Sequence, residues 1–413
     1  MGTTAELVAP FRGERYRDAA RLGAVIAPPY DVIAPAQRER LAAADPHNIV
    51  HLTLPEAPGG ADRYAHATAL LERWRREGVL VRDAAPAVYA LAQAFTLPSG
   101  ERRTRIGMFA AVAAEPYQSG RVRPHERTHA RVKAERLALL RATRTNLEAI
   151  LLLAPDPERA LADALARVTL GPPAARAELD GVQLSLWVVG GDEAARLAAS
   201  AGRHLLYVAD GHHRYETAAA YAEENAAAGR VEAFLVSTAD PGLVVLPTHR
   251  VIYGADRDPA ALVERWSRWF EVERLPAGTD PLAHLARVGA ERIACVVACP
   301  EGGDLSLVLR PDAALDGVPG GPAVRQLDAA VIESLVVHEI LGAGRSTPTL
   351  KYTAEAREAL DGVRKGVAAA AVLLNPTRVA QIMAIADAGG VMPPKSTFFV
   401  PKVPSGLVLC PTD

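Results

Sequence analysis

The stretch LLYVADGHHRYETA, residues 205–218, decides the fold class of this chain. Its first five residues are apolar and predict a short buried strand. Asp210 and Gly211 end that strand, and residues 212–228 have a helical composition that stops at Gly229. Residues 233–236 then predict a further strand. A strand that leads directly into a helix and is followed by another strand is typical of α/β proteins.

The chain on either side of this stretch supports the same class. Residues 87–97 and 103–113 alternate like strands and are joined by PSGE, which predicts a hairpin. Residues 62–77 have helical spacing, whereas residues 24–27 and 49–54 read as strands. Because hairpins occur beside strand–helix alternation, we predict an α/β fold with a mixed sheet. We expect a core over residues 1–255 and an α/β region over residues 256–413 that returns a lysine-containing loop to the core.

Composition excludes several classes of protein. The 413 residues include 46 Lys and Arg and 48 Asp and Glu, a balance that argues against a protein that coats nucleic acid. No apolar run reaches 18 residues, so we expect no membrane partner. Cys295, Cys299 and Cys410 are too few for a disulfide framework, which indicates the cytoplasm. The expected partner is a small molecule, and the oligomeric state stays open.

The turn ADGHHRYETA, residues 209–218, carries the strongest chemical signal. Gly211 lets the backbone turn sharply and approach a ligand closely. The first N–H groups of the helix that follows lack intrahelical partners and lie at the positive end of the helix dipole. His212, His213 and Arg214 add side-chain donors, so the turn is suited to a phosphate group. The plainer alternative is that Asp210 only caps the helix.

Four segments in order support a family resemblance. They are PPYDV (28–32), RPHE-x-T (123–128), DGHHRYETA (210–218) and MPPKSTFF-x-PK (392–402), and the chain resembles a widespread bacterial family that shares them. The DGHHRYE segment also resembles the phosphate-binding Gly-x-x-Arg turn of the ParB/sulfiredoxin superfamily, to which the archaeal free serine kinase belongs. The resemblance implies a ParB/sulfiredoxin-like nucleotide-binding core.

Two departures narrow what the resemblance implies. Sulfiredoxins carry a reactive thiol in this turn, whereas His212 stands at that position here, so we do not expect repair of sulfinic acids. ParB partition proteins add a DNA-binding helix-turn-helix and a basic surface, which this sequence lacks. The capacity to hold the phosphates of a nucleotide is what remains.

The PPYDV and RPHERTHA segments supply candidate side chains for chemistry. Two prolines stiffen the chain before Tyr30 and Asp31, which presents this carboxylate rigidly. Asp31 and Glu126 are candidates to bind Mg2+ or to accept the proton of a substrate hydroxyl. Tyr30, Arg123 and His125 are candidates to contact the substrate.

The same RPHERTHA segment contains an H-E-x-x-H string, His125 to His129, which is the pattern of zinc proteases. That pattern requires both histidines on one face of a helix. Pro124 and the arginine-rich flanks argue against such a helix, and Glu148 is the nearest candidate for a third ligand. A zinc hydrolase is therefore a minor alternative.

The sequence and the resemblance together predict a nucleotide-dependent phosphotransferase that acts on a small hydroxyl compound, with free L-serine as the best guess. The cofactors are ATP or ADP and Mg2+. The expected catalytic residues are Glu126, Asp31 and His213, and Lys395 is expected to stabilise the transferred group. The expected phosphate-binding residues are Asp210, Gly211, His212, His213, Arg214, Lys395, Ser396 and Thr397. A non-catalytic nucleotide-binding regulatory protein is the alternative.

Overall fold

The computed structural model describes residues 6–255, 258–300, 303–342 and 348–412. The chain forms two compact units, one of Met1–Val244 with Pro401–Asp413 and the other of Val245–Val400. The first division lies close to the predicted boundary after residue 255. A second boundary lies at residue 401, because the C-terminal segment returns to the first unit. A single boundary between two units does not describe this arrangement.

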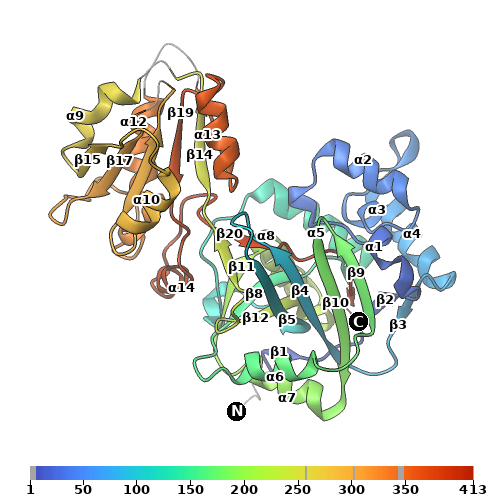
Figure 1. Ribbon diagram of the computed structural model, residues 1–413. Coiled ribbons are helices and arrows are strands. Elements are labelled where there is room, and N and C mark those ends of the chain that lie inside the picture. The colour runs from blue at the N-terminus through green and yellow to red at the C-terminus, as the bar shows by residue number, and fades with distance from the viewer. Residues whose placement is uncertain (1–5, 256–257, 301–302, 343–347, 413) are drawn as a thin grey trace. The chain divides into compact units, whose positions relative to one another are not determined.

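A nine-stranded sheet forms the centre of the first unit (Figure 1). Its strands are, in spatial order, β6 (Val122–Arg123), β11 (Leu206–Asp210), β8 (Ile150–Ala154), β12 (Arg230–Ser237), β5 (Arg102–Ala113), β4 (Ala87–Thr96), β10 (Val182–Gly190) and β9 (Ala175–Leu179), with β1 (Val8–Ala9) paired to β5. β11 runs parallel to β6 and β12 runs parallel to β8, whereas the other neighbours are antiparallel. The sheet is therefore mixed, which confirms the predicted fold class.

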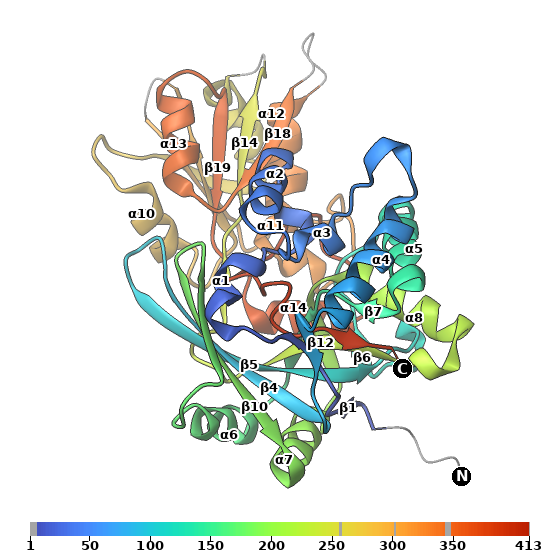
Figure 2. The same ribbon diagram turned by 90° about the vertical axis from the view of Figure 1, so that its right-hand side faces the viewer.

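Helices cover this sheet because the strands at its centre are apolar on both faces. The helices of the first unit are α1 (Leu22–Val25), α2 (Pro35–Ala44), α3 (Val50–Thr53), α4 (Arg63–Arg76), α5 (Ala130–Thr143), α6 (Ala160–Val168), α7 (Gly191–Ala201) and α8 (His212–Glu224). Leucines of α6 and α7 pack on one face of the sheet in a single core with Val88, Val112 and Leu152 (Figure 2). Burial of these apolar side chains is the main source of stability for such a layer.

The second unit is built on a six-stranded antiparallel sheet. Its strands are, in spatial order, β15 (Phe270–Arg274), β17 (Leu305–Leu309), β16 (Ala294–Ala298), β19 (Ala370–Leu374), β14 (His249–Tyr253) and β18 (Thr349–Thr353). Leu285 of α10 (Pro281–Val288) and Val363 of α13 (Ala356–Arg364) pack into its core. This unit thus has a hydrophobic core of its own.

The C-terminal segment is attached to the first unit by main-chain hydrogen bonds. Ser405 pairs with Ala27, and Leu409 pairs with Glu14. The short strand β21 (Cys410–Pro411) pairs with β7 (Thr145–Asn146). These contacts hold residues 401–412 as part of the unit that contains α8.

The prediction of a strand at residues 49–54 is wrong, because these residues form the short helix α3. Asn48 starts it: its side-chain oxygen accepts the N–H of Val50 at 3.0 Å, and its amide nitrogen donates to the carbonyl of Ile26 at 3.1 Å. Asn48 precedes the N-cap residue Ile49, and its side-chain bonds fix the turn that leads into α3 in place of an extended strand. Among the described residues, no helix combines the length and the apolar character that crossing a membrane requires.

Candidate functional site

The start of α8 presents main-chain donors without acceptors. β11 ends at Asp210, and Gly211 then turns the chain with φ +93°. The first intrahelical bond runs from the N–H of Tyr215 to the carbonyl of Gly211, at 3.0 Å. The N–H groups of the three residues between them, His212 to Arg214, have no acceptor in the described part of the chain. Such a helix start favours an anion.

Gly211 is required at this turn for two reasons. A side chain disfavours positive φ, and a Cβ at this position would lie 2.9 Å from Cγ2 of Ile150 and 3.0 Å from the guanidinium of Arg214. The backbone therefore turns closely beneath Arg214. The prediction that Gly211 makes a tight turn into a helix is confirmed.

Two cations hold the carboxylate of Asp210. Arg214 approaches one oxygen at 3.1 Å, and Nζ of Lys402 approaches the other at 3.0 Å. Burial alone would raise the pKa of this carboxyl, but the charges of Lys402 and Arg214 outweigh it and lower the pKa to about 2. Arg214 also donates to the main-chain carbonyl of Ala149. Asp210 is thus ionised at neutral pH and fixes both cations beside the turn.

Lys402 is a functional candidate to which the sequence pattern alone assigns no role. It ends the MPPKSTFF-x-PK segment, in which Lys395 is the lysine predicted to bind phosphate. Lys395, Ser396 and Thr397 belong to the second unit, where the hydroxyl of Ser396 donates to the carbonyl of Pro393 at 2.6 Å. Their assignment to the phosphate site stays a prediction.

The RPHERTHA segment lies against α8, as a shared site requires. The N–H of His125 donates to Nε2 of His212 at 3.4 Å, and the N–H of His129 donates to Nε2 of His213 at 2.8 Å. The hydroxyl of Thr128 donates to Glu216 at 2.7 Å. Two segments that are far apart in the sequence are thereby joined residue by residue.

These contacts define which ring nitrogen of His212 and of His213 carries a proton. Because Nε2 accepts in both His212 and His213, the ring proton of each neutral imidazole is on Nδ1. Burial lowers the pKa of both rings, strongly for His212, so both are neutral at pH 7. His213 is half-buried and offers a donor, whereas His212 is buried with Nδ1 3.7 Å from the carboxylate of Glu126. His212 therefore holds the segment that carries Glu126.

His125 and Arg123 differ from the expectation of exposed contact residues. His125 is 2 % exposed, its ring meets that of His212 edge-on at 4.6 Å, and burial lowers its pKa to about 4. Arg123 lies in β6, where it pairs in register with Tyr207 of β11. A role for either residue in binding substrate stays a prediction.

The zinc alternative has no support in the described residues. α5 begins at Ala130, after the H-E-x-x-H string, so the string does not present both histidines on one helix face. No group of three or more His, Cys, Asp or Glu residues in the described ranges is arranged to hold a metal ion.

The PPYDV segment is anchored by Glu148. The carboxylate of Glu148 accepts the N–H of Tyr30 at 2.9 Å and the hydroxyl of Ser405 at 3.0 Å. The guanidinium of Arg136 lies 4.2 Å from the centroid of the Tyr30 ring. Asp31 is exposed, and its charge acts on both His213 and Arg214. The structure therefore brings Asp31 near the first turn of α8. Glu148 joins the PPYDV segment to the C-terminal segment through Tyr30 and Ser405.

Glu232 is a buried carboxyl beside this network. It is fully buried on β12, and neither side-chain oxygen has a hydrogen-bond partner among the described residues. Burial raises its pKa well above the usual value, although the charge of Arg214 opposes the rise. A carboxyl with a raised pKa binds more protons in the folded than in the unfolded chain, so stability falls as pH rises above about 4.3.

The Glu232→Gln variant is therefore expected to be more stable than the wild type at pH 8, by about 1–3 kcal/mol in the free energy of unfolding. The difference is expected to shrink as pH falls toward 5, because protonation then costs the wild type less. Urea unfolding at both pH values measures it. A difference that does not change with pH would contradict the assignment.

Comparison with known proteins adds a family and a set of distant structures. The family model described as "Protein of unknown function (DUF1015)" matches residues 8–330. No curated protein matches significantly. Solved structures that align include a free serine kinase in complex with AMP, at 16 % identity and TM-score 0.37 over 71 % of this chain and 87 % of that one. A conserved hypothetical protein from Pyrococcus furiosus aligns at 15 % identity and TM-score 0.36, over 72 % and 93 % of the two chains. At these scores the alignments carry no inference about ligand or reaction.

Proposed function

The chain belongs to the DUF1015 family, and for this member we propose a nucleotide-dependent phosphotransferase that acts on a small hydroxyl compound, with free L-serine as the first acceptor to test. One observation carries the proposal. Three consecutive main-chain N–H groups at the start of α8, which have no partner among the described residues, lie beside two cations that Asp210 holds in place. This arrangement suits the phosphates of ATP or ADP.

We assign the phosphate contacts to donors of the turn and of the residues beside it. These are the main-chain N–H groups that follow Gly211, the Nδ1–H of His213 and the ammonium of Lys402. The guanidinium of Arg214 is bound to Asp210 and to the carbonyl of Ala149, so it stabilises the turn and is not assigned to the phosphates. Lys402 is the cation best placed to stabilise charge on a transferred phosphoryl group.

The charge balance of the site calls for a metal ion on the nucleotide. Asp210 already faces Lys402 and Arg214, and Glu216 faces Lys133 at 2.6 Å. An oligophosphate would add several negative charges to an almost neutral site. Mg2+ bound by its phosphates needs only one or two protein carboxylates, so no preformed cluster is required. The exposed Asp31 and the partly exposed Glu126 fit that task, and Mg2+ would offset phosphate charge there.

A carboxylate, in our proposal, accepts the proton of the substrate hydroxyl. His213 is a predicted catalytic residue, but its Nε2 accepts the N–H of His129. Its other ring nitrogen, Nδ1, carries the proton and can only donate, so His213 is not assigned as the base. Glu126 is partly exposed, and its carboxylate lies 3.7 Å from Nδ1 of His212, beside the start of α8. We therefore assign the base to Glu126 and the metal contact to Asp31.

The proposal is tested by binding and turnover in one set of proteins. Wild type is expected to gain thermal stability with Mg-ATP or Mg-ADP, and phosphorus NMR with L-serine and other hydroxy amino acids is expected to show a phosphorylated product. Arg214→Ala is expected to abolish the nucleotide-dependent rise in melting temperature, because the turn loses its support. The exposed Arg196 supplies the control Arg196→Ala, which is expected to behave as wild type.

Arg214→Lys keeps the charge at the turn and serves as a second variant if Arg214→Ala unfolds. Nucleotide binding by the wild type without product from any acceptor would favour the regulatory alternative. Absence of binding to ATP and ADP would contradict both functions.

A further inference from the structure

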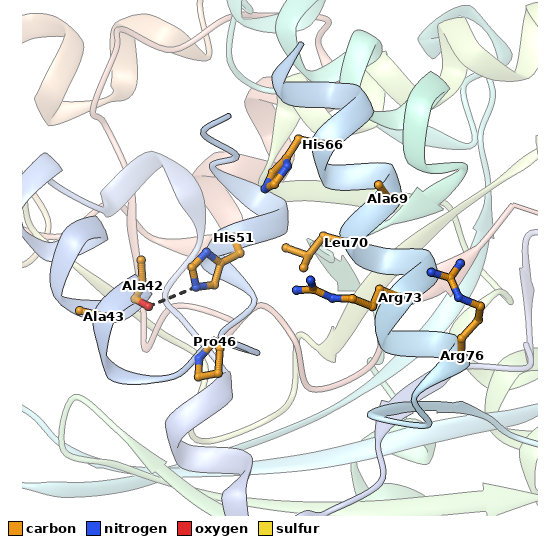
Figure 3. Close-up of a pocket in the computed structure, with 9 residues that line it drawn as sticks. All are labelled: Ala42, Ala43, Pro46, His51, His66, Ala69, Leu70, Arg73 and Arg76. Atoms are coloured by element: carbon orange, nitrogen blue, oxygen red, sulfur yellow. Dashed lines mark hydrogen bonds between the residues drawn. The ribbon is translucent and has the colours of Figure 1, made fainter. Parts of the chain in front are cut away.

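A pocket of about 620 Å³ lies on the helical side of the first unit, between α2, α3 and α4 (Figure 3). Its apolar lining comes from Ala42, Ala43, Pro46, Ala69 and Leu70. None of the residues that line it was assigned to the nucleotide site. The volume is in the range of pockets that bind small molecules.

The polar lining of this pocket is entirely basic or imidazole. It consists of His51, His66, Arg73 and Arg76, and none of the lining residues is acidic. Arg76 lies 4.0 Å from Glu72, whereas Arg73 has no ion pair or hydrogen bond from its side chain in the described ranges. Figure 3 shows the side chains of His66 and Arg73 extending from α4 toward the side of the pocket formed by His51. An unpaired guanidinium beside apolar surface favours an anionic group.

The periodicity of α4 explains how the pocket is built. Ala67, Leu71 and Trp74 face the core, whereas His66, Leu70 and Arg73, one turn apart, face the pocket. The helix thus presents an apolar centre with the imidazole of His66 at one end and the guanidinium of Arg73 at the other.

The opposite wall, α2, is short of packing. None of its residues from Pro35 to Ala44 is buried, although a helix of this length depends on tertiary contacts for stability. Its end is tied to α3 by a bond from Nε2 of His51 to the carbonyl of Ala42, at 3.2 Å. A ligand between α2 and α4 would add apolar contact to α2, whose residues are exposed or half-buried.

We propose that this pocket binds a small organic anion that joins an apolar body to one carboxylate or similar acidic group. The apolar body of this anion packs on Leu70 and the alanines of the pocket wall. Its acidic group pairs with Arg73, near His51 and His66. The proposal is independent of the nucleotide site, because the two share no residue.

The test uses anilinonaphthalenesulfonate as a fluorescent probe and octanoate as a competitor. Wild type is expected to bind the probe and to release it to octanoate, whereas octanol, which lacks the charge, and acetate, which lacks the apolar chain, are expected to compete at least about 10-fold less well. Mg-ADP is expected not to displace the probe.

Arg73→Gln is expected to weaken octanoate binding about 10-fold, because it removes the charge at nearly constant size. Ala69→Trp, at an exposed position of the pocket wall, is expected to block binding without a core change. Arg40→Gln removes an exposed arginine of α2 outside the pocket and is the matched control. Equal competition by octanol and octanoate, or wild-type binding by both pocket variants, would overturn the proposal.

Discussion

Lys402→Met is expected to weaken the binding of Mg-ATP or Mg-ADP about 100-fold, because it removes the ammonium that pairs with Asp210, two residues before α8 begins. Lys402 is partly buried, so water does not screen its charge as it would at an exposed site. Isothermal titration calorimetry measures the affinity. Lys402→Arg is expected to recover part of it, since the charge is kept.

Two further lysine variants make this result specific. Lys365→Met removes an exposed lysine of the second unit and is expected to bind nucleotide as wild type does. Lys395→Met tests the residue chosen from the sequence. If Lys395→Met loses nucleotide affinity while Lys402→Met keeps it, the assignment of Lys402 is wrong.

Acid unfolding shows whether Lys402→Met acts on Asp210 as the structure implies. A carboxylate with a depressed pKa contributes stability that is full above its unfolded value, about 3.9, and is lost as pH falls toward the folded value of about 2. Without Lys402 the pKa of Asp210 rises, so this contribution becomes smaller. The variant is therefore expected to be less stable than wild type at pH 7, with a smaller difference at pH 2.5.

Glu126→Gln is expected to lower kcat for phosphoryl transfer about 1,000-fold while nucleotide affinity stays within about threefold of wild type. The amide keeps the size of the side chain but accepts no proton. In our assignment Glu126 contacts the substrate hydroxyl and not the phosphates, so the affinity for nucleotide does not depend on its charge. Initial rates at saturating nucleotide and acceptor measure the effect.

Asp31→Asn separates the base from the metal contact. If Asp31 binds Mg2+, this variant is expected to need more Mg2+ for half-maximal rate, whereas Glu126→Gln is expected to keep the wild-type requirement. Glu223→Gln, at an exposed position near the end of α8, is the control. A wild-type kcat in Glu126→Gln would show that this residue is not the base. If Glu126→Gln needs more Mg2+ and Asp31→Asn does not, Glu126 contacts the metal and Asp31 is the base.

Local patterns predicted the elements whose signals lie within a few residues. The hairpin of β4 and β5 follows from alternation and the PSGE turn, and the β11–α8 unit follows from an apolar run, a glycine and a helical composition. The strand expected at 24–27 is instead the end of α1 (Leu22–Val25) followed by a single bridge from Ala27 to Ser405. That bridge depends on a segment hundreds of residues away, which no local pattern contains.

The candidate site divides in the same way. By itself the sequence determined the turn at Gly211, the donors that follow it and the carboxylates of two flanking segments, because these depend on residue type and short spacing. Only the tertiary structure decided that Lys402 faces Asp210, that Glu148 joins Tyr30 to Ser405, and which ring nitrogen of each histidine donates. Those contacts arise when the sheet and the C-terminal segment bring distant residues together, and their energies depend on burial that exists only in the folded chain.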